Sequence, residues 1–104
     1  MESDVVYNGR DNSSDWRLEA DGVPADLSAV TRFVLYLDSG TQQLTVDSDA
    51  APSAFDATPG GGVVRLLLGN QGLAPGRWGA ELVTYDPDHP DGLNWGGFAL
   101  HVVG

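Results

Sequence analysis

The chain has 104 residues, of which 41% are hydrophobic, and it contains no cysteine. This length suits one domain with a single core, and the lack of cysteine excludes disulfides and thiolate zinc sites as sources of stability. Fifteen acidic residues against five arginines give a net charge of -10 at pH 7, which disfavours binding to nucleic acid or to an anionic membrane.

The segment at residues 1–5 has neither the basic region nor the apolar run of a secretory signal, and no stretch approaches about 18 consecutive apolar residues. We therefore expect a soluble protein, and its compartment stays open. The excess of acidic residues also permits another function, in which the protein inhibits DNA-binding proteins by mimicking DNA. A mimic needs rows of carboxylates, whereas the acids here are scattered among turns.

Alternating apolar residues predict the first strands in chain order. Residues 3–7 and 14–20 have the pattern of short strands, and the second should point Trp16 and Leu18 inward. Residues 31–38 alternate clearly, with Phe33 on the core side and Tyr36 on the other. A turn at residues 39–40 then leads to a strand at residues 42–47, which predicts a hairpin.

The middle of the chain, residues 48–62, is rich in Pro, Gly and small polar residues, so we expect a loop that Phe55 pins to the core. Three further strands are predicted at residues 63–68, 77–86 and 93–103. Seven short strands and no helical apolar stripe predict an all-β fold, an immunoglobulin-like antiparallel β-sandwich of one domain over residues 1–104. A small barrel is the alternative.

The reagents for enzymatic catalysis are sparse. The chain has no Cys or Lys nucleophile and no Gly-x-Ser-x-Gly motif, so only His89 and His101 offer an imidazole base. His101 falls in an alternating run that predicts a solvent-facing strand position, and His89 lies in a loop between prolines. We therefore expect no enzymatic activity.

Metal and phosphate sites are also not expected. Asp86, Asp88 and Asp91 cluster as calcium ligands would, but Pro90 and Asp91 occupy the fifth and sixth places, where an EF-hand needs a ligand and then glycine. The glycines at residues 60–62 precede a strand, whereas a phosphate cradle needs a helix N-terminus or a basic group behind it. We predict neither a metal nor a cofactor.

The three tryptophans serve either the core or a sugar-stacking platform. Trp16 and Trp78 lie in predicted strands, and a small domain needs large side chains to fill its core, so we expect both to be buried. Trp95 is flanked by Asn94 and by two glycines, which allow another backbone to approach closely. It is therefore the leading candidate for a contact residue.

The order of these segments resembles that of small immunoglobulin-like β-sandwich domains in virion proteins of tailed viruses, including baseplate and tail-fibre modules. The segments that carry the resemblance are Val6-Tyr7, Asp15-Trp16-Arg17-Leu18, the run from Gly22 to Ser28, Phe33 to Leu37, Gly62 to Leu66, Leu73 to Trp78, Glu81 to Asp86, and Trp95-Gly96. At Pro75-Gly76-Arg77-Trp78, Trp stands where such sandwiches often have a corner Tyr. The resemblance spans nearly the whole chain, and its motifs specify architecture more strongly than role.

The resemblance implies a structural accessory subunit of the virion, in the tail, baseplate, collar or capsid decoration. Such a subunit is made in the host cytoplasm and contacts larger virion proteins in several symmetric copies. A carbohydrate-binding module that contacts a glycan of the host surface is the alternative. An open sheet leaves edges that another chain can pair with. We predict the protein interface on the last strand and the loop before it, at Asp86, His89, Asp91, Asn94, Trp95 and Gly97.

Overall fold

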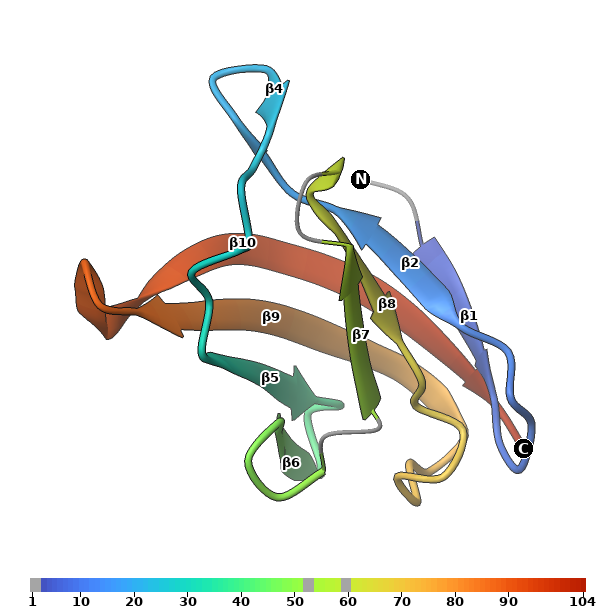
Figure 1. Cartoon of the computed structure of the whole chain (residues 1–104). Helices are drawn as coiled ribbons and strands as arrows, with labels where there is room; N and C mark the ends of the chain where they lie inside the picture. Colours follow the sequence, from blue (N-terminus) through green and yellow to red (C-terminus); the bar gives the residue numbers. More distant parts are fainter. Residues whose placement is uncertain (1–2, 52–53, 59–60) are drawn as a thin grey trace.

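The computed structural model describes residues 3–51, 54–58 and 61–104 (Figure 1). Its strands are β1 (Ser3–Tyr7), β2 (Ser14–Arg17), β3 (Glu19–Ala20), β4 (Val23–Pro24), β5 (Arg32–Asp38), β6 (Gln43–Asp47), β7 (Phe55–Thr58), β8 (Val63–Leu66), β9 (Gly76–Asp86) and β10 (His89–Val103). None of the described residues lies in an α-helix, and no helix in the described part is long and apolar enough to cross a membrane.

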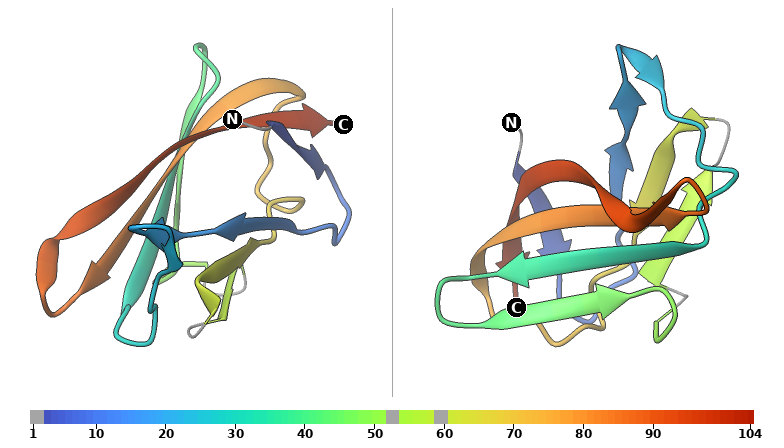
Figure 2. Two further views of the ribbon diagram at one scale, coloured as in Figure 1. Left: turned by 90° about the horizontal axis from the view of Figure 1, so that it is seen from above. Right: turned by 90° about the vertical axis from the view of Figure 1, so that its left-hand side faces the viewer.

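Two sheets form the layers of a sandwich (Figure 2). One has the strand order β1-β10-β9-β5-β6 and the other has the order β2-β8-β7, while β3 and β4 pair as a separate two-stranded hairpin. Two packed sheets without an α-helix among the described residues confirm the predicted all-β sandwich. One pairing departs from the antiparallel expectation: β1 runs parallel to β10, because the two strands come from opposite ends of the chain and no hairpin fixes their direction.

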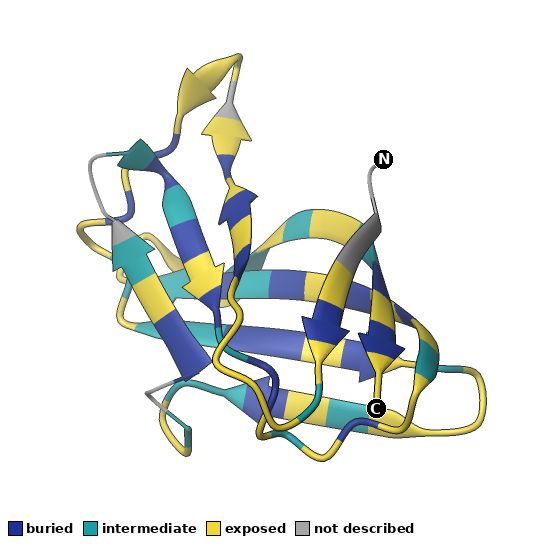
Figure 3. Ribbon diagram, turned by 90° about the vertical axis from the view of Figure 1, so that its right-hand side faces the viewer, coloured by how far each residue is buried: buried dark blue, intermediate teal, exposed yellow. Residues whose placement is uncertain are grey.

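Alternation along the strands produces the core (Figure 3). In β9, Trp78, Ala80, Leu82 and Thr84 are buried between the sheets, whereas Arg77 and the other alternate residues face outward. Trp16 and Trp78 are both buried, as predicted. The Trp16 ring stacks on Phe98 with 3.9 Å between ring centroids, so an aromatic contact joins β2 of the small sheet to β10 of the large one.

Two predicted segments differ from the structure. Residues 48–62 do not form one loop, since β7 lies within them; Phe55 at its start is buried and stacks on Phe33 with ring centroids 5.7 Å apart. The predicted strand at residues 14–20 is divided at Leu18, whose N–H donates to the carbonyl of Gly62 at 2.7 Å. The chain leaves the small sheet at this point and forms the hairpin of β3 and β4.

The corner before β9 keeps its hydrogen bond without a tyrosine. The indole Nε1–H of Trp78 donates to the carbonyl oxygen of Ala74 at 2.9 Å. A Tyr hydroxyl makes the comparable bond to nearby upstream backbone in many sandwiches of this type. Trp78 therefore fills the core and also fixes the turn into β9.

Candidate functional site

The last strand, β10, is flanked on both sides over only part of its length. β9 pairs with it from His89 to Val102, whereas β1 pairs only with residues 99–103. Among the described residues, no strand pairs with the other side of residues 89–98. This segment, the free half of β10, contains five of the six predicted interface residues; Asp86 lies at the end of β9.

A bulge in the free half of β10 decides which way its side chains point. The pairing register with β9 shifts between Asn94 and Gly97, and Gly96 between them has a φ of 95°. The Gly96 N–H donates to the side-chain oxygen of Asn94 at 2.7 Å, and the Asn94 amide donates to Glu81 on β9. These contacts hold Asn94 on the outer face of the sheet beside Glu81.

The structure places Trp95 against the core. Its ring is half-buried, and its Nε1–H donates to the hydroxyl of Thr84 at 2.9 Å. Phe98 is also packed against the core. The Trp95 side chain therefore anchors the bulge. The exposed residues of the free half of β10 are His89, Pro90, Asp91, Asn94, Gly96 and Gly97.

The turn between β9 and β10 is held by Asp86. Its carboxylate accepts hydrogen bonds from the N–H groups of Asp88 and His89, at 2.9 and 3.0 Å, and contacts Nδ1 of His89 at 3.0 Å. Burial alone would raise the pKa of Asp86, but its hydrogen bonds with His89 and Asp88 outweigh burial and lower that pKa. His89 and Asp91 are exposed, so the turn offers a rigid acidic tip.

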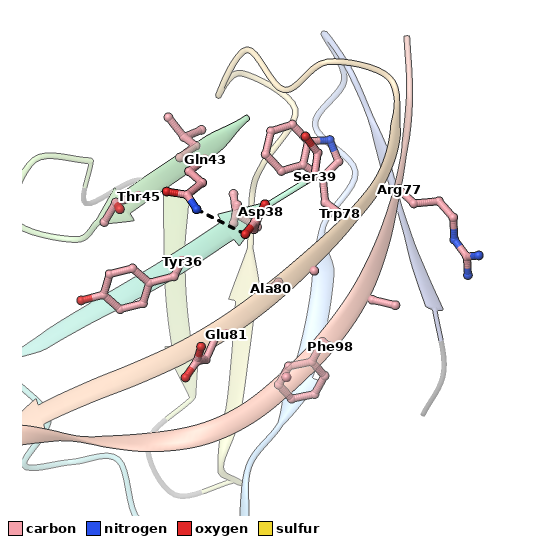
Figure 4. A pocket seen from close by; sticks show the side chains of 15 residues that line it. Tyr36, Asp38, Ser39, Gln43, Thr45, Arg77, Trp78, Ala80, Glu81 and Phe98 are labelled. Atoms are coloured by element: carbon pink, nitrogen blue, oxygen red, sulfur yellow. Dashed lines mark hydrogen bonds between the residues drawn. The ribbon is translucent and has the colours of Figure 1, made fainter. Parts of the chain in front are cut away.

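A hollow of about 860 Å³ lies on the large sheet, across β6, β5, β9 and β10 (Figure 4). Strand pairing arranges the outward-facing residues here in two rows. The first row is Thr45, Tyr36, Glu81 and Gly97, and the second is Gln43, Asp38, Gly79 and Ala99. In both rows the residues on β6 and β5 have polar or aromatic side chains, whereas the residues on β10 are Gly97 and Ala99. The floor of the hollow therefore lies at the glycines.

A second packed cluster supports the aromatic side of the hollow. Arg32 lies over the Tyr85 ring, 5.2 Å from its centroid, and its guanidinium pairs with Asp47. The outward-facing side chain of Val34 is only 2% exposed beside this cluster. The interaction of the Tyr36 phenol with that of Tyr85 raises the pKa of Tyr36.

Of the residues that line this hollow, only Gly97 is predicted from the sequence as a site residue, and that prediction assigns Gly97 to a protein interface. Tyr36 was placed correctly on the outer face, but its neighbours come from strands up to 63 positions away in the chain. The available signal was the alternation of small residues at outward positions, Gly79 in β9 and Gly97 and Ala99 in β10. These small residues can be assigned to one surface only when the register between β9 and β10 is known.

The remaining residues considered from the sequence are the acidic cluster and His101. No group of three or more His, Cys, Asp or Glu side chains in the described part of the chain is arranged to hold a metal ion. His101 is exposed on the outer face, as the alternation predicts. No protein-family model, curated protein or solved structure matches the chain.

Proposed function

We propose that this protein is a non-enzymatic assembly module, a structural accessory subunit of a tailed-virus particle, which joins a larger virion protein through the free half of β10. The proposal rests on one observation: β1 covers β10 from Ala99 onward, and no described strand covers residues 89–98. The β-sandwich fold and the resemblance in segment order to immunoglobulin-like virion domains support the same function.

A free strand edge presents N–H and C=O groups that an added strand can pair with. Pro90 has no N–H, so the useful edge begins at Asp91 and ends at Phe98. Gly96 and Gly97 leave room for a second backbone, because a Cβ added at Gly96 meets nothing within 4 Å and one added at Gly97 makes only an ordinary contact at 3.7 Å. Strand addition would extend the large sheet at the side of β10 that faces away from β9, without rearranging the core.

Charge indicates the chemistry of the partner. Residues 86–98 contain three Asp and no Arg, and the whole chain carries a net charge of -10. Two copies of this chain would repel each other at such an edge, whereas a basic strand would be attracted to it. We therefore propose a partner strand that is flanked by Lys or Arg.

The non-enzymatic part of the proposal is supported by the surroundings of the two imidazoles. His89 contacts the carboxylate of Asp86, with its Nδ1 3.0 Å from Oδ1. His101 lies opposite Arg77 on the outer face, and the chain offers no Cys or Lys as a nucleophile. Neither histidine is therefore assigned a catalytic role.

Cysteine footprinting tests the proposal, because the natural chain has no thiol. Asp91→Cys places one thiol on the free half of β10, and Asp56→Cys is a matched control at an exposed position of β7 with the same loss of charge. In tailed-virus particles purified from the source culture, we expect maleimide labelling of residue 91 to be at least about tenfold slower than in the free protein, with no change at residue 56.

Two results would contradict the proposal. If the wild-type chain is missing from purified particles, the virion function is wrong. If the chain is present but residue 91 reacts as fast as in the free protein, or residues 91 and 56 are protected equally, the assigned contact surface is wrong.

A further inference from the structure

We propose that the hollow on the outer face of the large sheet is a binding site for a neutral pyranose ring of an oligosaccharide. Its volume of about 860 Å³ falls within the usual range of small-ligand sites, roughly 300–1,000 Å³. The site lies on a sheet face and the proposed protein contact is a strand edge, so the inference does not depend on the assembly function.

The floor of the hollow contains glycines that the fold does not require. A Cβ added at Gly79 would lie 3.7 Å from the carbonyl oxygen of Asp38, and one added at Gly97 would lie 3.7 Å from that of Ala80, both ordinary contacts. Neither glycine has a positive φ. Glycine weakens a strand, so two dispensable glycines at diagonal positions of the neighbouring strands β9 and β10 point to close approach of a ligand.

One wall of the hollow is an exposed aromatic ring. Tyr36 is 43% exposed, and it stands beside Glu81 in the first row of outward-facing residues. The C–H groups on the apolar face of a pyranose carry partial positive charge and are attracted to the negative face of an aromatic ring.

Polar side chains beside this ring match the hydroxyl groups of a sugar. The Gln43 amide donates to the Asp38 carboxylate at 3.4 Å, and the Asn94 amide donates to Glu81. Each carboxylate retains acceptor positions for sugar hydroxyls, and bonds of this kind are stronger than those between neutral groups. Figure 4 shows Tyr36, Asp38 and Glu81 along the hollow, which lies between acceptors and an aromatic ring.

Charge selects a neutral sugar over an anionic one. Asp38 and Glu81 lie at the hollow, and the lining cation, Arg77, extends away from the other labelled side chains in Figure 4. Sialylated or sulfated glycans would meet these carboxylates and the field of a chain with net charge -10. The structure therefore assigns the site to uncharged hexoses.

A glycan array that contains neutral, sialylated and sulfated oligosaccharides, probed with the wild-type protein, tests this assignment. We expect binding to neutral glycans only. Calorimetry with the best neutral oligosaccharide should then show a loss of affinity of about tenfold for Tyr36→Ala. Gly79→Gln, which fills the floor without a backbone clash, should abolish binding.

Tyr7→Ala is the matched control, because Tyr7 is 44% exposed on β1 and does not line the hollow. It should bind as the wild type does, and melting curves should show that each variant is folded. The assignment is overturned if no neutral glycan binds, if anionic glycans are preferred, if Gly79→Gln keeps its affinity, or if Tyr7→Ala loses as much as Tyr36→Ala. None of these results bears on the labelling of residue 91 in particles.

Discussion

Replacement of Gly62 by alanine should destabilise the fold far more than the same change at Gly72. The two glycines have nearly the same left-handed backbone, with φ values of 66° and 71°. An added Cβ at Gly72 meets nothing within 4 Å, whereas at Gly62 it would lie 2.6 Å from the carbonyl oxygen of Leu18 and 2.8 Å from the nitrogen of Ala25. The comparison therefore separates backbone strain from steric conflict.

The expected magnitudes follow from the contacts. Left-handed alanine costs about 1–2 kcal/mol, partly offset by about 0.4–1 kcal/mol from the restricted unfolded chain, so Gly72→Ala should cost roughly 1 kcal/mol. At Gly62 the backbone must also move. That movement disturbs the bond from Leu18 N–H to the Gly62 carbonyl, 2.7 Å, and the bond from Ala25 N–H to the Leu18 carbonyl, 2.9 Å. Each is a buried bond whose loss costs about 1–3 kcal/mol.

Thermal unfolding followed by circular dichroism measures the difference. We expect Gly62→Ala to lose at least about 2 kcal/mol more than Gly72→Ala, which corresponds to a gap in Tm on the order of 10 °C for a domain of this size. Equal Tm losses would refute the reasoning. They would mean that the close approach of the Leu18 and Ala25 backbones to Gly62 does not constrain the fold.

Three further measurements test other parts of the structure. The pKa of Asp47 is lowered, first by its hydrogen bond from Arg32; wild type should therefore be more stable than Asp47→Asn at pH 7, and the gap should close as the pH falls from about 4 through the lowered pKa of the folded state. A gap that stays constant down to pH 2 would contradict this. Because a net charge of -10 repels itself, Tm should rise between low and molar sodium chloride, and a flat or falling Tm would rule out self-repulsion as a significant effect. Trp95→Phe keeps a ring against the core but loses the hydrogen bond to Thr84, so urea unfolding should show a loss of about 1 kcal/mol, whereas an unchanged midpoint would mean that this bond contributes nothing.

The fold was predictable where alternation was clean. In β5 the pattern placed Phe33 inward and Tyr36 outward, and both assignments are confirmed. The pattern assigned β7 to a loop because only Phe55 in that four-residue strand is a large apolar residue. Val34 shows a second limit of the alternation pattern, because it faces outward but is only 2% exposed. The pattern within β5 does not reveal how side chains from the neighbouring strands β6 and β9 cover it.

The candidate surfaces depended on pairing that local patterns do not contain. Strict alternation would place Trp95 and Phe98 on opposite faces, but the bulge at Gly96 adds a residue and both rings pack against the core. The free edge depends on where β1 begins to pair, at Ala99, and β1 is far away in sequence. The register between strands, and not residue type, determines both the orientation of the two rings and the position of the free edge.

The most direct test of the assembly proposal is a cryo-EM reconstruction of the purified particle at a resolution that separates strands. The proposal predicts the sandwich bound to a larger virion protein, with one strand of that protein paired alongside β10 from Asp91 to Phe98. A sandwich that is bound through another face while residues 91–98 face solvent, or a particle that contains no such sandwich, would contradict the proposal.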